Sequence, residues 1–69
     1  MKLSARNTLA GTVKQVTLGP VSAEVIIEVA GQAEIVAVIS AESAKALDLK
    51  QGKRAYAVIK ASNVMVGVD

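Results

Sequence analysis

The clearest β-strand pattern in the chain is Val21-Ser22-Ala23-Glu24-Val25-Ile26-Ile27-Glu28-Val29. Every odd-numbered position in this segment is apolar, whereas three of the four even-numbered positions are polar. Such alternation places one face of a strand on a core and the other face in water. Ile26 interrupts the polar face, and we expect it to contact a second subunit. The segment therefore predicts a half-buried strand.

Two further strands flank this segment. Residues 9–18 alternate with a change of phase near residues 14–15, which indicates a strand with a bulge or a bend. Gly19-Pro20 marks the turn that follows it. After a hairpin turn at Gly31-Gln32, residues 33–39 are apolar on both faces apart from a single glutamate. We therefore expect residues 33–39 to form a strand that is covered on both sides.

The second half of the chain predicts a short helix and two more strands. Ser40 is a favourable N-cap, and the alanine, glutamate and lysine residues that follow favour a helix over residues 41–47. A polar link turned by Gly52 leads to a fourth strand at residues 54–60, and residues 64–68 predict a fifth. Three strands, one short helix and two strands are the order of the OB-type barrel. We predict a mainly β fold, a small five-stranded OB-like barrel with one short helix between strands 3 and 4.

Length and composition predict a single domain, residues 1–69, that associates with copies of itself. A domain of this size buries only about 60% of the surface that its unfolded chain exposes. The chain has no cysteine for disulfides and no histidine for a common type of metal site. An apolar fraction of 52% is high for so small an interior, so oligomerisation is the remaining way to stabilise it.

The same composition argues against several classes of function. Without histidine and cysteine there is no catalytic triad, and the six carboxylates form neither an acid–base pair nor a hard-metal cluster. No phosphate-loop motif occurs. The first residues lack the apolar core of a signal peptide, and the longest apolar runs have five residues. We expect a cytoplasmic, non-enzymatic protein with no organic cofactor, no free metal cation and no membrane partner.

Hydrogen-bond donors gather instead at the ends of the predicted elements: Ser4 and Arg6 before the first strand, Ser40 and Ser43 at the helix start, and Lys60, Ser62 and Asn63 after the fourth strand. A tetrahedral oxyanion needs donors on several sides and positive charge. Arginine offers a fork of donors, lysine a point charge and serine a neutral hydroxyl, while a helix N-terminus adds free N–H groups. Each residue also has a simpler interpretation: Ser40 as a helix cap, and Arg6 and Lys60 as solvated charges.

Two segments of the chain resemble a known family. Ser4-Ala5-Arg6-Asn7 is similar to the opening S-A-R-N motif of the Mop (molbindin) family, and Val58-Ile59-Lys60-Ala61-Ser62-Asn63-Val64-Met65-Val66 to its closing strand, turn and strand. Segments 19–25 and 38–47 also fall where the family has similar ones, so the resemblance covers essentially the whole chain. It implies an OB-like barrel that binds molybdate or tungstate for intracellular molybdenum storage or homeostasis. It also implies a homohexamer, built as a trimer of dimers, with the anions held between subunits.

The family pattern carries over to individual residues of this chain. It implies an oxyanion site made by Ser4, Ala5, Arg6, Ser40, Ser43, Lys60 and Ala61. The leader of one subunit would meet the helix start and Lys60 of its neighbour. A second class of site, on a threefold axis, would use Gly19, Val21 and Ser22.

Two alternatives from other classes remain at this point. The predicted fold order and the eight basic residues suit an OB-type nucleic-acid-binding module, although Tyr56 is the single aromatic residue available for stacking on bases. We therefore do not expect a nucleic-acid partner. The apolar excess suits a purely structural assembly subunit that ignores anions.

Overall fold

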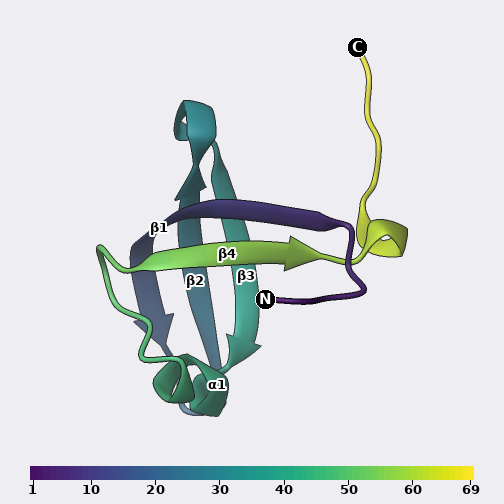
Figure 1. Cartoon of the computed structure of the whole chain (residues 1–69). Helices are drawn as coiled ribbons and strands as arrows, with labels where there is room; N and C mark the ends of the chain where they lie inside the picture. Colours follow the sequence, from purple (N-terminus) through teal and green to yellow (C-terminus); the bar gives the residue numbers. More distant parts are fainter.

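The computed structural model describes all residues, Met1–Asp69, and shows one curled antiparallel sheet with a short helix at one end (Figure 1). The elements in chain order are β1 (Asn7–Leu18), β2 (Ser22–Val29), the 3₁₀ turn η1 (Ala30–Gln32), β3 (Glu34–Ser40), α1 (Ala41–Ala46), β4 (Arg54–Ile59) and the 3₁₀ turn η2 (Ala61–Asn63). The strand order is β3-β2-β1-β4. The mainly β class and the helix between the third and fourth strands are confirmed. No helix is long and apolar enough to cross a membrane.

The long strand β1 connects the two halves of the sheet. Its first half, Asn7–Thr12, pairs with β4, and Gly11–Leu18 pairs with β2. The register shifts between Val13 and Gln15, which confirms the bulge expected from the change of phase. A bulge bends its strand. In Figure 1, β4 and the first half of β1 consequently cross over β2 and β3 at a steep angle.

The extra residue of this bulge links β1 to β3. Lys14 Nζ donates a hydrogen bond to the Glu34 carboxylate, and the two side chains form an ion pair. This hydrogen bond, with the negative charge of Glu34, raises the pKa of Lys14 above its ordinary value of 10.5. Both side chains are substantially exposed, so solvent screens the pair and it adds little to stability.

The core lies between the sheet's curled halves and is small. Val13 and Val25 are 1% exposed and join Ile27 and Ala57 in one cluster, and Glu24 on the opposite face of β2 is exposed. The half-buried strand predicted at residues 21–29 is thus confirmed, with its first residue in the preceding turn. Only 7 of 69 residues are buried, so this core is too thin to be strongly stable alone.

Two sequence predictions differ from the structure. Residues 33–39 do form a strand, but it is not covered on both sides: Val36 and Val38 are 59% and 70% exposed. The reason is that β3 is an edge strand and no element of the chain covers its outer face. The fifth strand at residues 64–68 is absent, because a strand needs a partner ladder and this segment extends away from the sheet after η2 (Figure 1).

Candidate oxyanion-binding site

The leader and Lys60 lie together at one end of the sheet. Asn7 is the register partner of Ile59, and its side-chain Nδ2 donates a hydrogen bond to the Ile59 carbonyl oxygen at 3.3 Å. Arg6 and Lys60 are the neighbours of this pair along the chain. The pairing of β1 with β4 therefore brings the donors before β1 beside the donors after β4.

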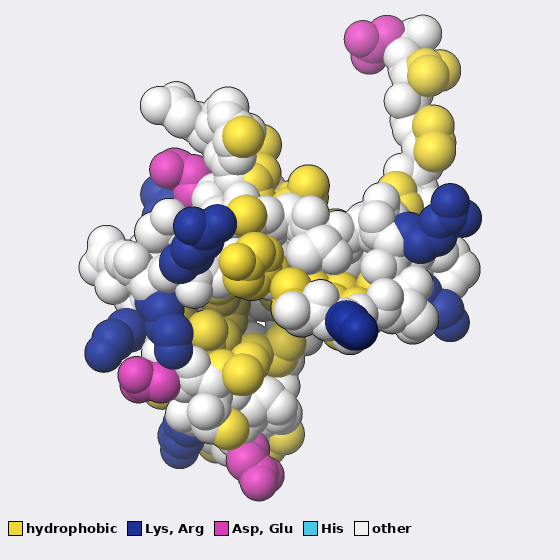
Figure 2. Space-filling model, viewed as in Figure 1, with side chains coloured by type: hydrophobic (Ala, Val, Ile, Leu, Met, Phe, Trp, Pro, Cys, Tyr) yellow, Lys and Arg dark blue, Asp and Glu magenta, His cyan; other side chains and the backbone are white.

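This end of the molecule is positively charged. The ion pairs of the chain are Lys14–Glu34 and Lys50–Asp48, so neither Arg6 nor Lys60 has a carboxylate partner. Both side chains are exposed. Figure 2 shows dark-blue side chains over the leader and η2 with no acidic side chain among them. Two unpaired cations beside serine and backbone donors suit an oxyanion, whose hydrogen bonds to them would be charge-assisted.

Ser40 and Ser43 form a second group, at the start of α1. Ser40 Oγ accepts a hydrogen bond from the Ser43 N–H at 3.0 Å and donates one to Ser43 Oγ at 2.8 Å. The predicted N-cap is thus confirmed. The Ala41 N–H donates to the Val21 carbonyl oxygen at 2.8 Å. The helix start therefore offers fewer free N–H groups than expected, because the N–H groups of Ala41 and Ser43 already have partners.

The residues expected at a second site lie against this serine group. Ser22 is the register partner of Ser40. The Gly19 N–H donates to the Ser22 carbonyl oxygen at 2.8 Å, which closes the turn between β1 and β2. The side chain of Val21 is 79% exposed. The N–H of Gly19 and the carbonyl of Val21 already have partners within the chain, and the exposed Ser22 hydroxyl is the side-chain donor of this turn.

The chain alone does not unite the first group with the second. Arg6 comes directly before β1, whereas Leu18 at the far end of β1 pairs with Ala23, next to Ser22 and Ser40. Lys60 lies with the leader of its own chain and not with the helix start.

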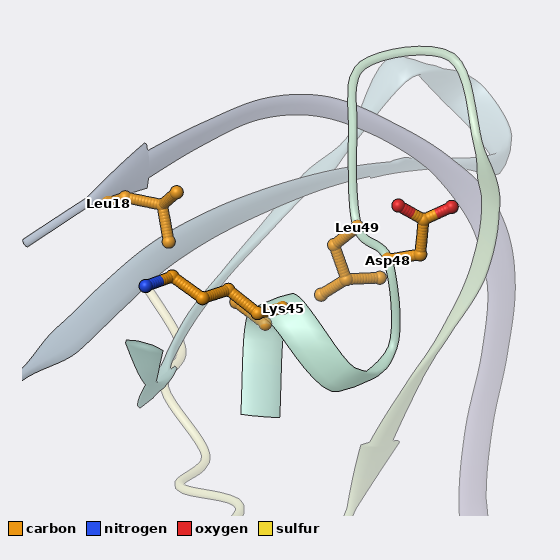
Figure 3. A pocket seen from close by; sticks show the side chains of 5 residues that line it. Leu18, Lys45, Asp48 and Leu49 are labelled. Carbon is orange, nitrogen blue, oxygen red and sulfur yellow. The ribbon is translucent and has the colours of Figure 1, made fainter. Parts of the chain in front are cut away.

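A hollow of about 230 Å³ lies between the end of β1 and α1, and none of its lining residues belongs to either donor group. Its lining residues are Leu18, Ala44, Lys45, Asp48 and Leu49, and none was predicted from the sequence. Figure 3 shows Lys45 reaching toward Leu18, with Asp48 beyond Leu49 on the other side. One carboxylate and two leucines make this hollow a poor place for an anion.

The single aromatic side chain bears on the nucleic-acid alternative. Tyr56 is 46% exposed, but the Arg54 guanidinium carbon lies 5.7 Å from the centre of its ring. A base would have to displace this arginine in order to stack on that face of the ring. This contact weakens the case for a nucleic-acid-binding surface.

Comparisons with known proteins identify the family. The TOBE domain family matches residues 3–66. A protein of Haemophilus influenzae described as a probable molybdenum-pterin-binding protein is 46% identical over 69 residues, 100% of each chain. The solved structure of a molybdate binding protein from Sporomusa ovata has 37% identity and a TM-score of 0.92, over 99% of this chain and 100% of that one.

A further solved structure contains the ligand that the motifs imply. It is described as the cytoplasmic molybdate-binding protein ModG with molybdate bound. The identity is 49% and the TM-score 0.95, over 100% of this chain and 49% of that one, so this chain spans about half of ModG. These likenesses confirm the predicted fold class. The chain belongs to the TOBE domain family and, within it, to the molybdenum-pterin-binding (Mop) proteins.

Proposed function

We propose that this protein binds molybdate or tungstate and serves in molybdenum storage or homeostasis in the cytoplasm. The observation that carries the proposal is the pair of unpaired cations, Arg6 and Lys60, placed side by side by the β1–β4 pairing. Molybdate is a dianion, so two cations with neutral donors around them match its charge. The relatives' names and the molybdate in the ModG structure support the same ligand.

The site lies between copies of the chain. Ser4, Ala5, Arg6, Lys60 and Ala61 form one half of it, and Ser40 with Ser43 of another copy forms the other half. Support comes from the separation of these groups at opposite ends of β1. A ligand that binds only the assembled form would also stabilise the assembly. Gly19, Val21 and Ser22 would contribute to a second site, and the copies would build a hexamer as a trimer of dimers.

Calorimetric titration of the purified protein with molybdate, with sulfate in a parallel run, tests this proposal. We expect saturable molybdate binding and a much smaller response to sulfate. Tungstate has nearly the shape and charge of molybdate and should bind comparably. An absence of heat with all three anions, checked by equilibrium dialysis, would contradict the proposal and favour a purely structural assembly role.

Variants of Ser40 separate its role as a helix cap from its role at the anion. Ser40→Ala should lower the free energy of unfolding by about 1 kcal/mol, because the bond from the Ser43 N–H is lost. Ser40→Asp should keep the cap, since aspartate is an equally good N-cap, and should therefore retain stability. The carboxylate of Ser40→Asp would repel the dianion, so molybdate affinity should fall further in Ser40→Asp than in Ser40→Ala. Equal molybdate affinity in Ser40→Asp and the unmodified protein would remove Ser40 from the site.

A further inference from the structure

The last residue of the opening motif, Asn7, has no role in the proposed anion site. It is the first residue of β1 and lies opposite Ile59 in the last rung of the β1–β4 ladder. Asn7 is partly buried, and its Nδ2 donates a hydrogen bond to the Ile59 carbonyl oxygen at 3.3 Å. Among the side-chain hydrogen bonds of the chain, this one joins the residues farthest apart in sequence, with a separation of 52. It therefore ties the start of β1 to the end of β4.

The bond lies where the ladder ends. Beyond this rung both segments leave the sheet, with Arg6 before β1 and Lys60 after β4. The end of a ladder opens more readily than its centre, because the last rung has a neighbouring rung on one side only. A side-chain bond at the last rung consequently restrains the residues that follow it, which the same bond in the middle of the sheet would not do.

The accepting carbonyl belongs to the peptide group that joins Ile59 to Lys60. A peptide group is planar, so the direction of the Ile59 C=O bond also fixes the position of the Lys60 N–H and Cα. The next carbonyl oxygen, that of Lys60, accepts a hydrogen bond from the Asn63 N–H at 2.9 Å as η2 closes. The backbone of Lys60 is thus held on both sides, although its side chain is exposed and has no ion-pair partner.

We propose that Asn7 is a positioning residue for the anion site, which holds the backbone from which Lys60 projects. This inference rests on the proposed function. A lysine ammonium is carried on a flexible four-carbon stem, and a fixed starting point reduces the freedom that the side chain loses when it binds an anion. The asparagine amide is a neutral donor, so it restrains the backbone without adding a charge beside Arg6 and Lys60.

Asn7→Leu tests this role, because leucine has nearly the shape of asparagine but no donor. We expect the Kd for molybdate to rise by about 2- to 10-fold, the worth of one neutral hydrogen bond. The matched control is Gln15→Leu, which removes another side-chain amide that donates at 3.3 Å, in this case to Thr17 Oγ1. The control should leave the Kd unchanged. Equal Kd values for Asn7→Leu and the unmodified protein would overturn the proposal.

A double-mutant cycle distinguishes the positioning of Lys60 from a general effect on the fold. If Asn7 acts through Lys60, the rise in Kd caused by Asn7→Leu should disappear in a Lys60→Ala background. The same rise should persist in a Lys50→Ala background, because Lys50 pairs with Asp48 and is not part of the site. An equal rise in both backgrounds would show that Asn7 supports the fold as a whole, which contradicts the proposal.

A measurement without anion separates this inference from the proposed function. In molybdate-free protein, Asn7→Leu should lower the NMR backbone order parameters of Lys60 and Ala61, while that of the buried Val25 should not change. Unchanged order parameters at Lys60 would overturn the inference even in a protein that binds molybdate. Lower order parameters at Lys60 in a protein that binds no molybdate would contradict the proposed function and leave the hold of Asn7 on Lys60 standing.

Discussion

Replacement of Gly11 by alanine is expected to lower the free energy of unfolding by about 1–3 kcal/mol, the usual cost of overpacking a well-packed site. A Cβ atom at this position would overlap the carbonyl oxygen of Glu28 and lie 2.9 Å from Ile27 Cγ2. Gly11 pairs with Val29 on one side and with Ala55 on the other. Backbone on both sides is held by ladders, so the added methyl group cannot be accommodated by a side-chain rotation.

Gly67→Ala provides the control, because nothing lies within 4 Å of a Cβ atom there. Urea unfolding at matched protein concentration, followed by circular dichroism, measures both variants, since association makes stability depend on concentration. We expect the Gly67 variant to change the free energy of unfolding by less than about 0.5 kcal/mol, as is usual for surface substitutions. Equal unfolding midpoints for both variants would show that β2 moves aside and that the close approach at Gly11 is unimportant.

The sequence predicted those features that depend on neighbouring residues. The alternation of residues 21–29 identified the buried face of β2. The change of phase within residues 9–18 located the bulge of β1 at Lys14. The cap at Ser40 followed from a residue type whose side chain accepts a hydrogen bond from a backbone N–H group three residues later, here that of Ser43. In each case the cause lies within a few residues of the effect.

Features that depend on distant contacts were not predicted. A glycine inside a strand indicates a close approach, but not that Glu28 of the next strand makes it. The apolar pattern of residues 33–39 predicted cover on both faces, but no other element of the chain covers the outer face of β3, where Val36 and Val38 are exposed. Likewise, the placement of Lys60 beside Arg6 follows from the β1–β4 register, which a list of donors in chain order does not contain.

Removing either cation of the candidate site should produce the largest loss of function. We expect Arg6→Ala and Lys60→Ala each to weaken molybdate binding by about 1.5–3 kcal/mol, the worth of a hydrogen bond to a charged group, or roughly 10- to 150-fold in Kd. Neither residue has a carboxylate partner or packs in the core, so unfolding stability without anion should be unchanged. Calorimetry gives the affinity, and thermal unfolding without molybdate gives the stability.

Two comparisons distinguish a local site from the general charge of the molecule. Lys50→Ala removes one positive charge outside the candidate site, where Lys50 Nζ lies 3.6 Å from Asp48 Oδ2. This variant should leave molybdate affinity nearly unchanged. Arg6→Lys keeps the charge but loses the planar fork of donors, and should fall between Arg6→Ala and the unmodified protein. If Lys50→Ala weakens binding as much as Arg6→Ala, long-range attraction accounts for the affinity and the assigned site is wrong. If Arg6 and Lys60 contact the same anion, the double variant should lose less than the sum of the single losses, because neighbouring groups on one ligand are not independent.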